Sequence, residues 1–294
     1  MLESGNLLNG IKNIKMSNKT TTIIEPRSGW QFIDWREILH YKDLLYFMVK
    51  REVTVLYKQT ILGFSWAIIR PVFSMIVFSI VFGGLAKVPS DGIPYPVFSY
   101  VALVPWTYFS TAMTRSTQSL VSGSGIFTKV YFPRMIIPLT PVISGLVDFT
   151  IALSVVGVLM TYYSILPTLN ILWLPLLIVL MIMTSSGVGM WLSALAIQYR
   201  DVAFATLFLS QMLMYAAPVV WPVSLIGEKF GNTASLIYGL YPMAGVIEGF
   251  RSALLGHNPM PWDLIGMGSI TAVFLFVSGA LYFKHKEGIF SDVA

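Results

Sequence analysis

Residues 149–199 read FTIALSVVGVLMTYYSILPTLNILWLPLLIVLMIMTSSGVGMWLSALAIQY, a run of 51 residues that contains no Asp, Glu, Lys or Arg. One α-helix of that length would extend about 75 Å, whereas the hydrocarbon core of a bilayer is about 30 Å thick. The run must therefore fold back on itself, and the hinge is expected at 162–170, where YYSILPTLN places Pro and polar residues between two apolar stretches. The run thus predicts the completion of one membrane-spanning helix and the whole of the next.

The composition of the whole chain also favours a membrane protein. Of its 294 residues, 55% are hydrophobic and 11% are charged, whereas soluble domains carry about 25% charged residues. A mean hydropathy of +0.72 excludes a water-soluble globule, and 14% aromatic residues exclude an intrinsically disordered chain. The chain has no cysteine, which excludes a disulfide framework, a thiolate metal site and a cysteine nucleophile.

Other sparsely charged runs extend the prediction to an all-α integral membrane fold with six transmembrane helices. The predicted spans cover about residues 61–86, 96–121, 135–162, 170–198, 202–222 and 263–284, within a transmembrane domain over 59–294. Arg70 is the one charge in the first span and Asp148 the one charge in the third. Charges at that depth normally face protein or water. The two therefore either pair with each other or face a conduit.

The segment 230–247 is also uncharged, but several Gly residues, an Asn and a Pro make it a poor spanning helix. With six crossings and a cytosolic amino terminus, 15 basic residues lie on the cytosolic side, as the positive-inside rule requires. The three outside are Lys87, Lys229 and Arg251. A seventh crossing would move the basic carboxyl-terminal end outside. We therefore expect both termini in the cytosol, and short re-entrant gate helices in the outer segment 224–256, between spans five and six.

The amino-terminal region is expected to stay in the cytosol. Residues 1–29 are rich in Asn, Lys, Ser and Thr and predict a flexible tail. Over 30–58, apolar residues recur at spacings of three, four and seven between charged residues, which predicts an amphipathic interface helix. Such a helix suits the headgroup plane of the membrane, and packing against a cytosolic partner is an alternative compatible with that position.

Sequence patterns of catalysis and metal binding are missing. The chain has no Gly-Lys dipeptide, so it has no P-loop and cannot hydrolyse ATP by that mechanism. His40, His257 and His285 have no partner at metal-ligand spacing. Small residues at 185–189, SSGVG, are expected to be close helix contacts rather than nucleophiles. We therefore expect no catalytic residue and no metal site.

Short motifs follow one another in order along residues 30–294. They are KRE at 50–52, YKQTILG at 57–63, RP at 70–71, PYP at 94–96, PW at 105–106, KVYFPR at 129–134, YRDV at 199–202, APV at 217–219, YPM at 241–243 and EGIFSD at 287–292. In this order they resemble the permease subunits of type-2 ATP-binding-cassette exporters. Within that group the chain is similar to polysaccharide permeases that export O-antigen, capsule or teichoic-acid chains.

This resemblance implies a homodimer bound to two copies of a separate nucleotide-binding ATPase subunit. ATP and Mg²⁺ would be used by that subunit, so this chain would bind no cofactor and would be a transporter subunit rather than an enzyme. The cytosolic segment 118–134 would be a coupling helix seated on the ATPase, with an ordinary basic anchor at the end of a span as the alternative. The residues implied in coupling are Lys129, Tyr131, Phe132, Arg134, Arg200 and Asp201.

The substrate implied is a lipid-linked polysaccharide, moved from the cytosol across the inner membrane. Sugar rings stack on aromatic faces, and the family forms its channel largely from spans one and five at the dimer interface. The candidate conduit residues are Phe64, Trp66, Arg70, Phe73, Phe78, Tyr215 and Trp221, and the candidate exit-gate residues are Tyr238 and Tyr241. A belt of lipid-facing aromatic residues is the alternative for these positions. A pyrophosphate anchor on the substrate would meet Lys58 or Arg70 at the cytosolic rim.

Three other functions compete with polysaccharide export. The first is a type-2 exporter of a drug, lipid or peptide, which the motifs disfavour only by similarity. The second is a membrane-embedded glycosyltransferase, for which Glu228, Glu248 and Asp263 are outside acids without a motif. The third is a secondary carrier, which would usually show repeated halves with interrupted spans that this sequence lacks.

Overall fold

The computed structural model describes residues 39–58, 63–127 and 132–290. Within these ranges the chain forms ten α-helices and no β-strand, which confirms the all-α class. The predicted tail 1–29, the beginning of the predicted interface helix, and the predicted coupling residues Lys129 and Tyr131 lie outside the described residues.

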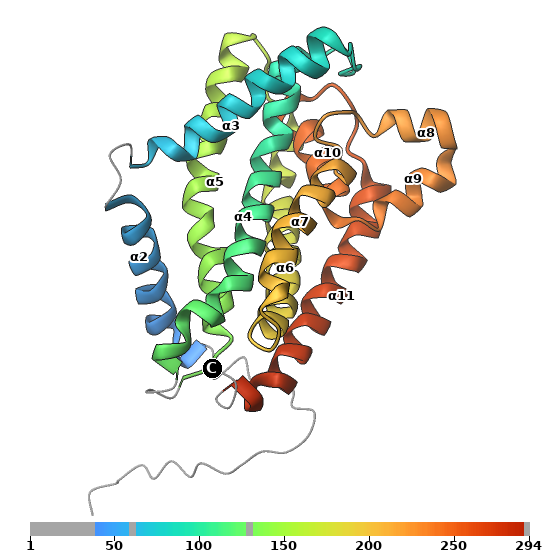
Figure 1. Ribbon diagram of the computed structural model, residues 1–294. Coiled ribbons are helices and arrows are strands. Elements are labelled where there is room, and N and C mark those ends of the chain that lie inside the picture. Colours follow the sequence, from blue (N-terminus) through green and yellow to red (C-terminus); the bar gives the residue numbers. More distant parts are fainter. Residues whose placement is uncertain (1–38, 59–62, 128–131, 291–294) are drawn as a thin grey trace, which may run out of the picture.

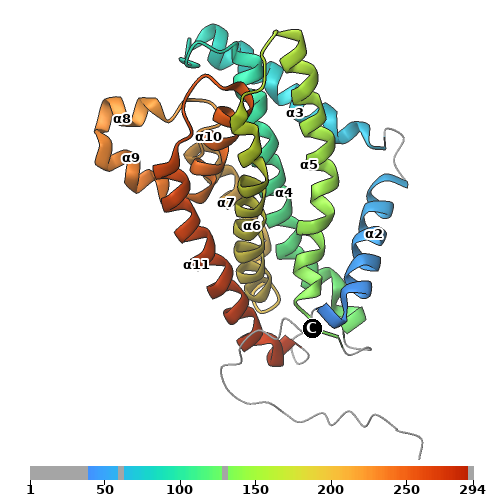
Figure 2. The same ribbon diagram turned by 180° about the vertical axis from the view of Figure 1, so that it is seen from behind.

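Four long helices run side by side and form the body of the molecule (Figures 1 and 2). They are α4 (Tyr95–Phe127), α5 (Ile136–Tyr162), α6 (Leu174–Ala196) and α11 (Trp262–Lys286). α4 packs against α5 and α6, and α6 packs against α11. Because α4 is enclosed by its neighbours, it carries buried polar side chains that lipid would not accept. One of them, the Ser116 hydroxyl, donates a hydrogen bond to the Pro138 carbonyl at 2.7 Å.

Helices occupy all six segments in which the sequence predicts spans. Four are long and apolar enough to cross a membrane: α5, α11, α3 (Ser65–Phe78) with its π-helical extension Ser79–Leu85, and α6 with the preceding 3₁₀ turn Leu169–Trp173. α7 (Asp201–Ala216) is apolar but shorter. α4 has 33 residues, about 50 Å of helix, and its polar content reflects its central position.

The predicted close packing at 185–189 is confirmed, since α6 and α11 meet through small residues there. A Cβ atom on Gly187 would lie 2.5 Å from the carbonyl carbon of Leu275, and one on Gly279 would overlap the carbonyl oxygen of Gly187. Ser185 and Ser186 are buried beside them. Only glycine permits the two backbones to approach this closely.

Shorter helices lie at the two ends of this body. At one end, near the last turns of α11, α2 (Lys42–Lys58) packs alongside α5 (Figure 1). Toward the other end lie α8 (Ser224–Phe230), α9 (Asn232–Gly239) and α10 (Pro242–Leu255). α8 and α9 meet at Gly231, whose φ of +83° favours glycine. The segment 230–247 is thus divided between short helices, and every residue of α10 is buried.

Candidate functional site

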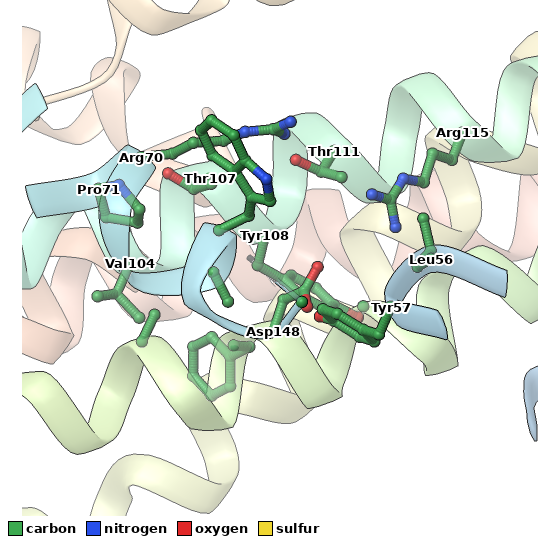
Figure 3. Close-up of a pocket in the computed structure, with 16 residues that line it drawn as sticks. Leu56, Tyr57, Arg70, Pro71, Val104, Thr107, Tyr108, Thr111, Arg115 and Asp148 are labelled. Carbon is green, nitrogen blue, oxygen red and sulfur yellow. The ribbon is translucent and has the colours of Figure 1, made fainter. Parts of the chain in front are cut away.

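A cavity of about 280 Å³ lies where α2 ends and α3 begins, against α4 and α5 (Figure 3). α4 contributes a stripe of side chains at helical spacing, from Val104 through Tyr108 and Thr111 to Arg115. α5 contributes Asp148. The full set of lining residues is Leu56, Tyr57, Gly63, Trp66, Ala67, Arg70, Pro71, Val104, Thr107, Tyr108, Thr111, Arg115, Gly145, Asp148, Phe149 and Ala152.

Three charged side chains line this cavity: Arg70, Arg115 and Asp148. Arg115 Nη1 and Asp148 Oδ1 are buried and make no hydrogen bond within the part of the chain that the structure describes. Among those residues, no carboxylate oxygen lies within 4.0 Å of either guanidinium, so Arg70 and Asp148 share the cavity without forming the ion pair considered from the sequence. Unpaired charges at membrane depth are costly and usually functional.

One further acid, Glu52 on α2, lies near Arg115 but does not line the cavity. Burial raises the pKa of the Glu52 carboxyl above its ordinary value, while Arg115 and a hydrogen bond from Ser144 act in the opposite direction. Glu52 is thus a partial counter-charge to Arg115 across the helix interface, at a distance too long for an ion pair.

Aromatic rings surround the charged groups. The Arg70 guanidinium carbon lies 5.5 Å from the centre of the Trp66 ring, within the range of a cation–π contact. The Tyr108 hydroxyl donates to the Val142 carbonyl at 2.8 Å, and the Tyr108 ring meets the Phe149 ring edge to face at 5.7 Å. The cavity therefore combines fixed aromatic faces with free charged groups.

A second group of charges near the other end of the molecule is fully paired. Arg251 on α10 donates to the Glu248 carboxylate at 3.1 Å, to the Val219 carbonyl at 2.9 Å and, over longer distances, to the carbonyls of Phe98 and Trp221. Its guanidinium carbon also lies 3.6 Å from the centre of the Phe98 ring. This pair fastens the α7–α8 connection to α4 and α10. Glu248 is thus bonded inside the protein rather than displayed in an outer cleft.

The candidate exit-gate residues hold the short helices against the end of α7. The Tyr238 hydroxyl donates to the Ala216 carbonyl at 2.6 Å, and the Tyr241 hydroxyl donates to the Leu213 carbonyl at 3.2 Å. The Tyr238 ring lies 5.6 Å from the Trp221 ring. These bonds tie the segment 224–256 to α7, the helix expected to line a conduit.

The other candidate conduit residues do not lie together. Trp66 and Arg70 line the cavity, whereas Phe73 on α3 and Tyr215 on α7 are exposed on different helices. Phe64 is exposed and stacks on Tyr57 at 3.9 Å, and Phe78 packs against Phe82 at 5.5 Å. One copy of the chain does not bring the α3 and α7 aromatic residues to a common cavity among its described residues.

The candidate coupling residues are divided between internal and exposed positions. Phe132 is buried in an apolar cluster with Phe283 and Phe290. Arg134 is bound to Glu287 by its backbone N–H, at 3.2 Å, and by its guanidinium, which donates to the Glu287 carbonyl. Glu287 also forms an ion pair with Lys284 at 2.6 Å. Arg200 and Asp201, at the start of α7, are exposed. α4 continues through Phe127, so the first part of the segment 118–134 belongs to that helix.

Sequence reasoning did not single out Arg115. It was counted as one of the basic residues on the cytosolic side, whereas the structure places it in the cavity wall. The 3–4 spacing of Val104, Thr107, Tyr108, Thr111 and Arg115 was the signal that would have found it, because these residues share one face of a helix.

Comparison with known proteins identifies the family. The family model of the ABC-2 type transporter membrane component matches residues 43–255. The chain is 26% identical to the O-antigen export system permease protein RfbA of Myxococcus xanthus, over 86% of this chain and 96% of that protein. It is also 26% identical to the RfbA protein of Klebsiella pneumoniae, over 85% and 95%, and 25% identical to the polysialic acid transport protein KpsM of Escherichia coli, over 82% and 93%. The chain therefore belongs to the ABC-2 type transporter family of multi-pass membrane proteins.

Proposed function

We propose that this chain is the channel-forming subunit of an ATP-driven exporter that moves a lipid-linked, O-antigen-like polysaccharide out of the cytosol. The observation that carries the proposal is similarity over nearly the whole chain to permeases whose names specify O-antigen export or polysialic acid transport. Both kinds of relative handle long hydrophilic polymers. Most of the ordered motifs that resemble the polysaccharide group lie within residues 43–255, which the family model matches.

Transport requires a second protein, because this chain has no P-loop with which to bind and hydrolyse ATP. We propose two copies of a nucleotide-binding subunit at the cytosolic end, where α2 and the carboxyl terminus lie together (Figure 1). Arg200 and Asp201 are exposed and available to contact it. Phe132 and Arg134 would act differently, by fixing the position of the loop between α4 and α5 through the cluster around Glu287 and Phe290.

A dimer would form the conduit. Helices pack 8–10 Å apart and their side chains fill the space between them, so one bundle is too narrow to enclose a hydrated sugar chain. Phe64 just before α3, Phe73 on α3 and Tyr215 on α7 are exposed in one copy. Pairing of two copies would turn these aromatic residues toward a shared seam, with Tyr238 and Tyr241 near its outer end. The six crossings, both termini in the cytosol and an inner-membrane location belong to the same proposal.

Deleting the gene in its host and locating the polysaccharide tests this function. We expect the polymer to disappear from the cell surface and to accumulate inside, because synthesis continues while export stops. Normal surface polysaccharide in the deletion strain would contradict the proposal. Reporter tags on both termini test the topology separately. Tags that report from opposite sides of the membrane would contradict six crossings, and two tags that report from the periplasm would contradict the cytosolic termini.

A further inference from the structure

The cavity between α2, α3, α4 and α5 is not accounted for by a conduit at a dimer seam. Arg70, Arg115 and Asp148 have no hydrogen-bond or ion-pair partner among the described residues. In the outer cluster, by contrast, the one buried arginine uses four acceptors. Arg115 Nη1 and Asp148 Oδ1 are buried, and polar groups buried without partners carry a desolvation penalty that a bound ligand would offset. Arg70 lines the same cavity from an exposed position.

The volume of the cavity limits the ligand. Sites for small molecules have volumes of about 300–1,000 Å³, and this cavity, at about 280 Å³, lies just below that range. A polysaccharide chain does not fit inside it. A single headgroup does.

The lining residues determine the chemistry of the headgroup. Two guanidinium groups, Arg70 and Arg115, supply only donors and match the oxygens of a phosphate. Asp148, whose Oδ1 has no partner, requires a donor from the ligand. Glu52 offsets part of the charge of Arg115 from outside the cavity wall, whereas Arg70 forms no ion pair among the described residues. The arrangement complements a phosphate that carries an N–H or O–H donor a few bonds away.

The rim of the cavity favours a ligand that is anchored in the membrane. Trp66, which lines the cavity, is exposed, as is Ile69 close to it on α3. α3 is one of the helices long and apolar enough to cross the bilayer, and most of its surface is not covered by the rest of the chain. Acyl or polyprenyl chains would lie along this apolar surface while the headgroup enters between α3 and α4.

We propose that the cavity binds the phosphate of a membrane lipid whose headgroup also carries an N–H or O–H donor, with the phosphate on Arg70 and Arg115 and the donor on Asp148. Two lipids share this chemistry. One is a polyprenyl sugar phosphate, the class to which the phosphate-linked end of the export substrate would belong; the other is an aminoethyl-phosphate lipid of the bilayer. Binding of a polyprenyl sugar phosphate would rest on the proposed function, because it would identify the anchored end of the export substrate. Lipid binding itself is measured without transport, so the two proposals can fail separately.

The test is native mass spectrometry of the purified full-length chain with four probes. These are a polyprenyl sugar phosphate, phosphatidylethanolamine, phosphatidylcholine and diacylglycerol. Phosphatidylcholine differs from phosphatidylethanolamine in lacking N–H donors, and diacylglycerol lacks the phosphate. We expect one of the first two probes to bind at least 10-fold more tightly than the last two, and the tighter of them identifies the source. Equal retention of all four lipids would overturn the proposal.

Variants of the chain assign this binding to the cavity. Arg70→Gln and Arg115→Gln should each weaken the preferred lipid at least 10-fold, and Asp148→Asn should reduce the preference for phosphatidylethanolamine over phosphatidylcholine. Lys87→Gln, which removes an exposed positive charge from a residue that does not line the cavity, is the matched control and should bind as the wild type does. Because Arg70 is exposed and forms no ion pair within the described part of the chain, Arg70→Gln remains a valid test if Arg115→Gln does not fold. Unchanged binding by Arg70→Gln would contradict the assignment.

Discussion

Two groups of charged residues inside this chain differ in how they are satisfied. Arg251 is 3% exposed and is held by Glu248, by three backbone carbonyls and by the Phe98 ring. Arg115 lines a cavity and has neither a hydrogen bond nor an ion pair among the described residues. The first arrangement joins three parts of the chain into one rigid unit. The second leaves its charges available to a ligand.

This difference separates structural charges from functional ones. Removing one member of a paired buried group leaves its partner without a counter-charge, whereas removing an unpaired charge relieves a desolvation penalty. Substitutions in the outer cluster should therefore act on folding, and substitutions in the cavity should act on binding and export with the fold intact.

The largest loss of stability is expected from Arg251→Leu. It would leave Glu248 buried without a partner and remove the donors to Val219, at a cost of about 3–5 kcal/mol. Unfolding of the purified chain in mixed micelles measures the loss. The double variant Arg251→Leu/Glu248→Leu should regain part of it, because no unpaired charge remains. If Arg251→Leu alone is as stable as the wild type, the structural role proposed for the Arg251–Glu248 pair is wrong.

The next largest effect is expected where α6 meets α11. Gly279→Ala would place a methyl group against the backbone of Gly187 and force the helices apart, at a cost of about 1–3 kcal/mol. Gly266→Ala on the same helix is the matched control, because a Cβ there meets nothing within 4 Å. The same unfolding assay should show no loss for Gly266→Ala. Equal effects of the two variants would contradict the close packing.

A smaller effect on stability is expected from Glu287→Gln at the end of α11. The variant loses the ion pair with Lys284 and weakens the bond from the Arg134 backbone, a change of about 1 kcal/mol. Because these bonds position the loop between α4 and α5, we expect export to fall further than the amount of the chain in the membrane. Surface polysaccharide and membrane protein are measured together. The exposed Glu228→Gln is the control, and parallel loss of both quantities would argue against a positioning role.

Asp148→Asn is expected to leave stability unchanged or to raise it slightly, since the carboxylate that it removes forms no ion pair with any residue that the structure describes. Export should nevertheless decrease, because the amide is a weaker acceptor for the headgroup donor. The measurement pairs the unfolding assay with surface polysaccharide. Marked destabilisation by this variant would place Asp148 with the structural charges.

The smallest effect concerns the pH dependence of stability at Glu52. Burial raises the pKa of this carboxyl in the folded state, so the folded chain retains the proton at a higher pH than the unfolded chain does. The resulting stability is present at acidic pH and is lost as the pH rises through the raised pKa. Lowering the pH from neutral should therefore stabilise the wild type more than Glu52→Gln. Identical pH profiles would indicate that the Glu52 pKa is not raised.

The sequence predicted the helical class because uncharged runs of spanning length leave few alternatives in a bilayer. It also predicted the interruption of 230–247, since the glycines and the proline in this segment disfavour one continuous helix. The close packing at Gly187 was recognisable from residue size alone. These features depend on local composition, which a single sequence displays directly.

The satisfaction of the charges could not be predicted in the same way. Arg251 and Glu248 are three residues apart. The backbone carbonyls that accept hydrogen bonds from Arg251, such as that of Val219, lie 30 or more residues away. Arg115 lies near a predicted helix end and was assigned to the cytosolic basic residues, whereas α4 continues past it to Phe127. Tertiary packing determines which charged side chains form ion pairs or hydrogen bonds. The periodicity of one helix predicts only the face of the helix on which a charged residue lies.

Reconstitution of the chain in lipid vesicles, with and without its nucleotide-binding subunit, addresses the proposed export activity directly. Lipid-linked polysaccharide is supplied on the side that exposes the nucleotide-binding subunit, and its transfer across the bilayer is followed by a lectin confined to the opposite side. We expect transfer only when the chain, the ATPase subunit and hydrolysable ATP are all present. Transfer by the chain without the ATPase subunit, or no transfer by the complete system, would contradict the assignment as an ATP-driven polysaccharide permease.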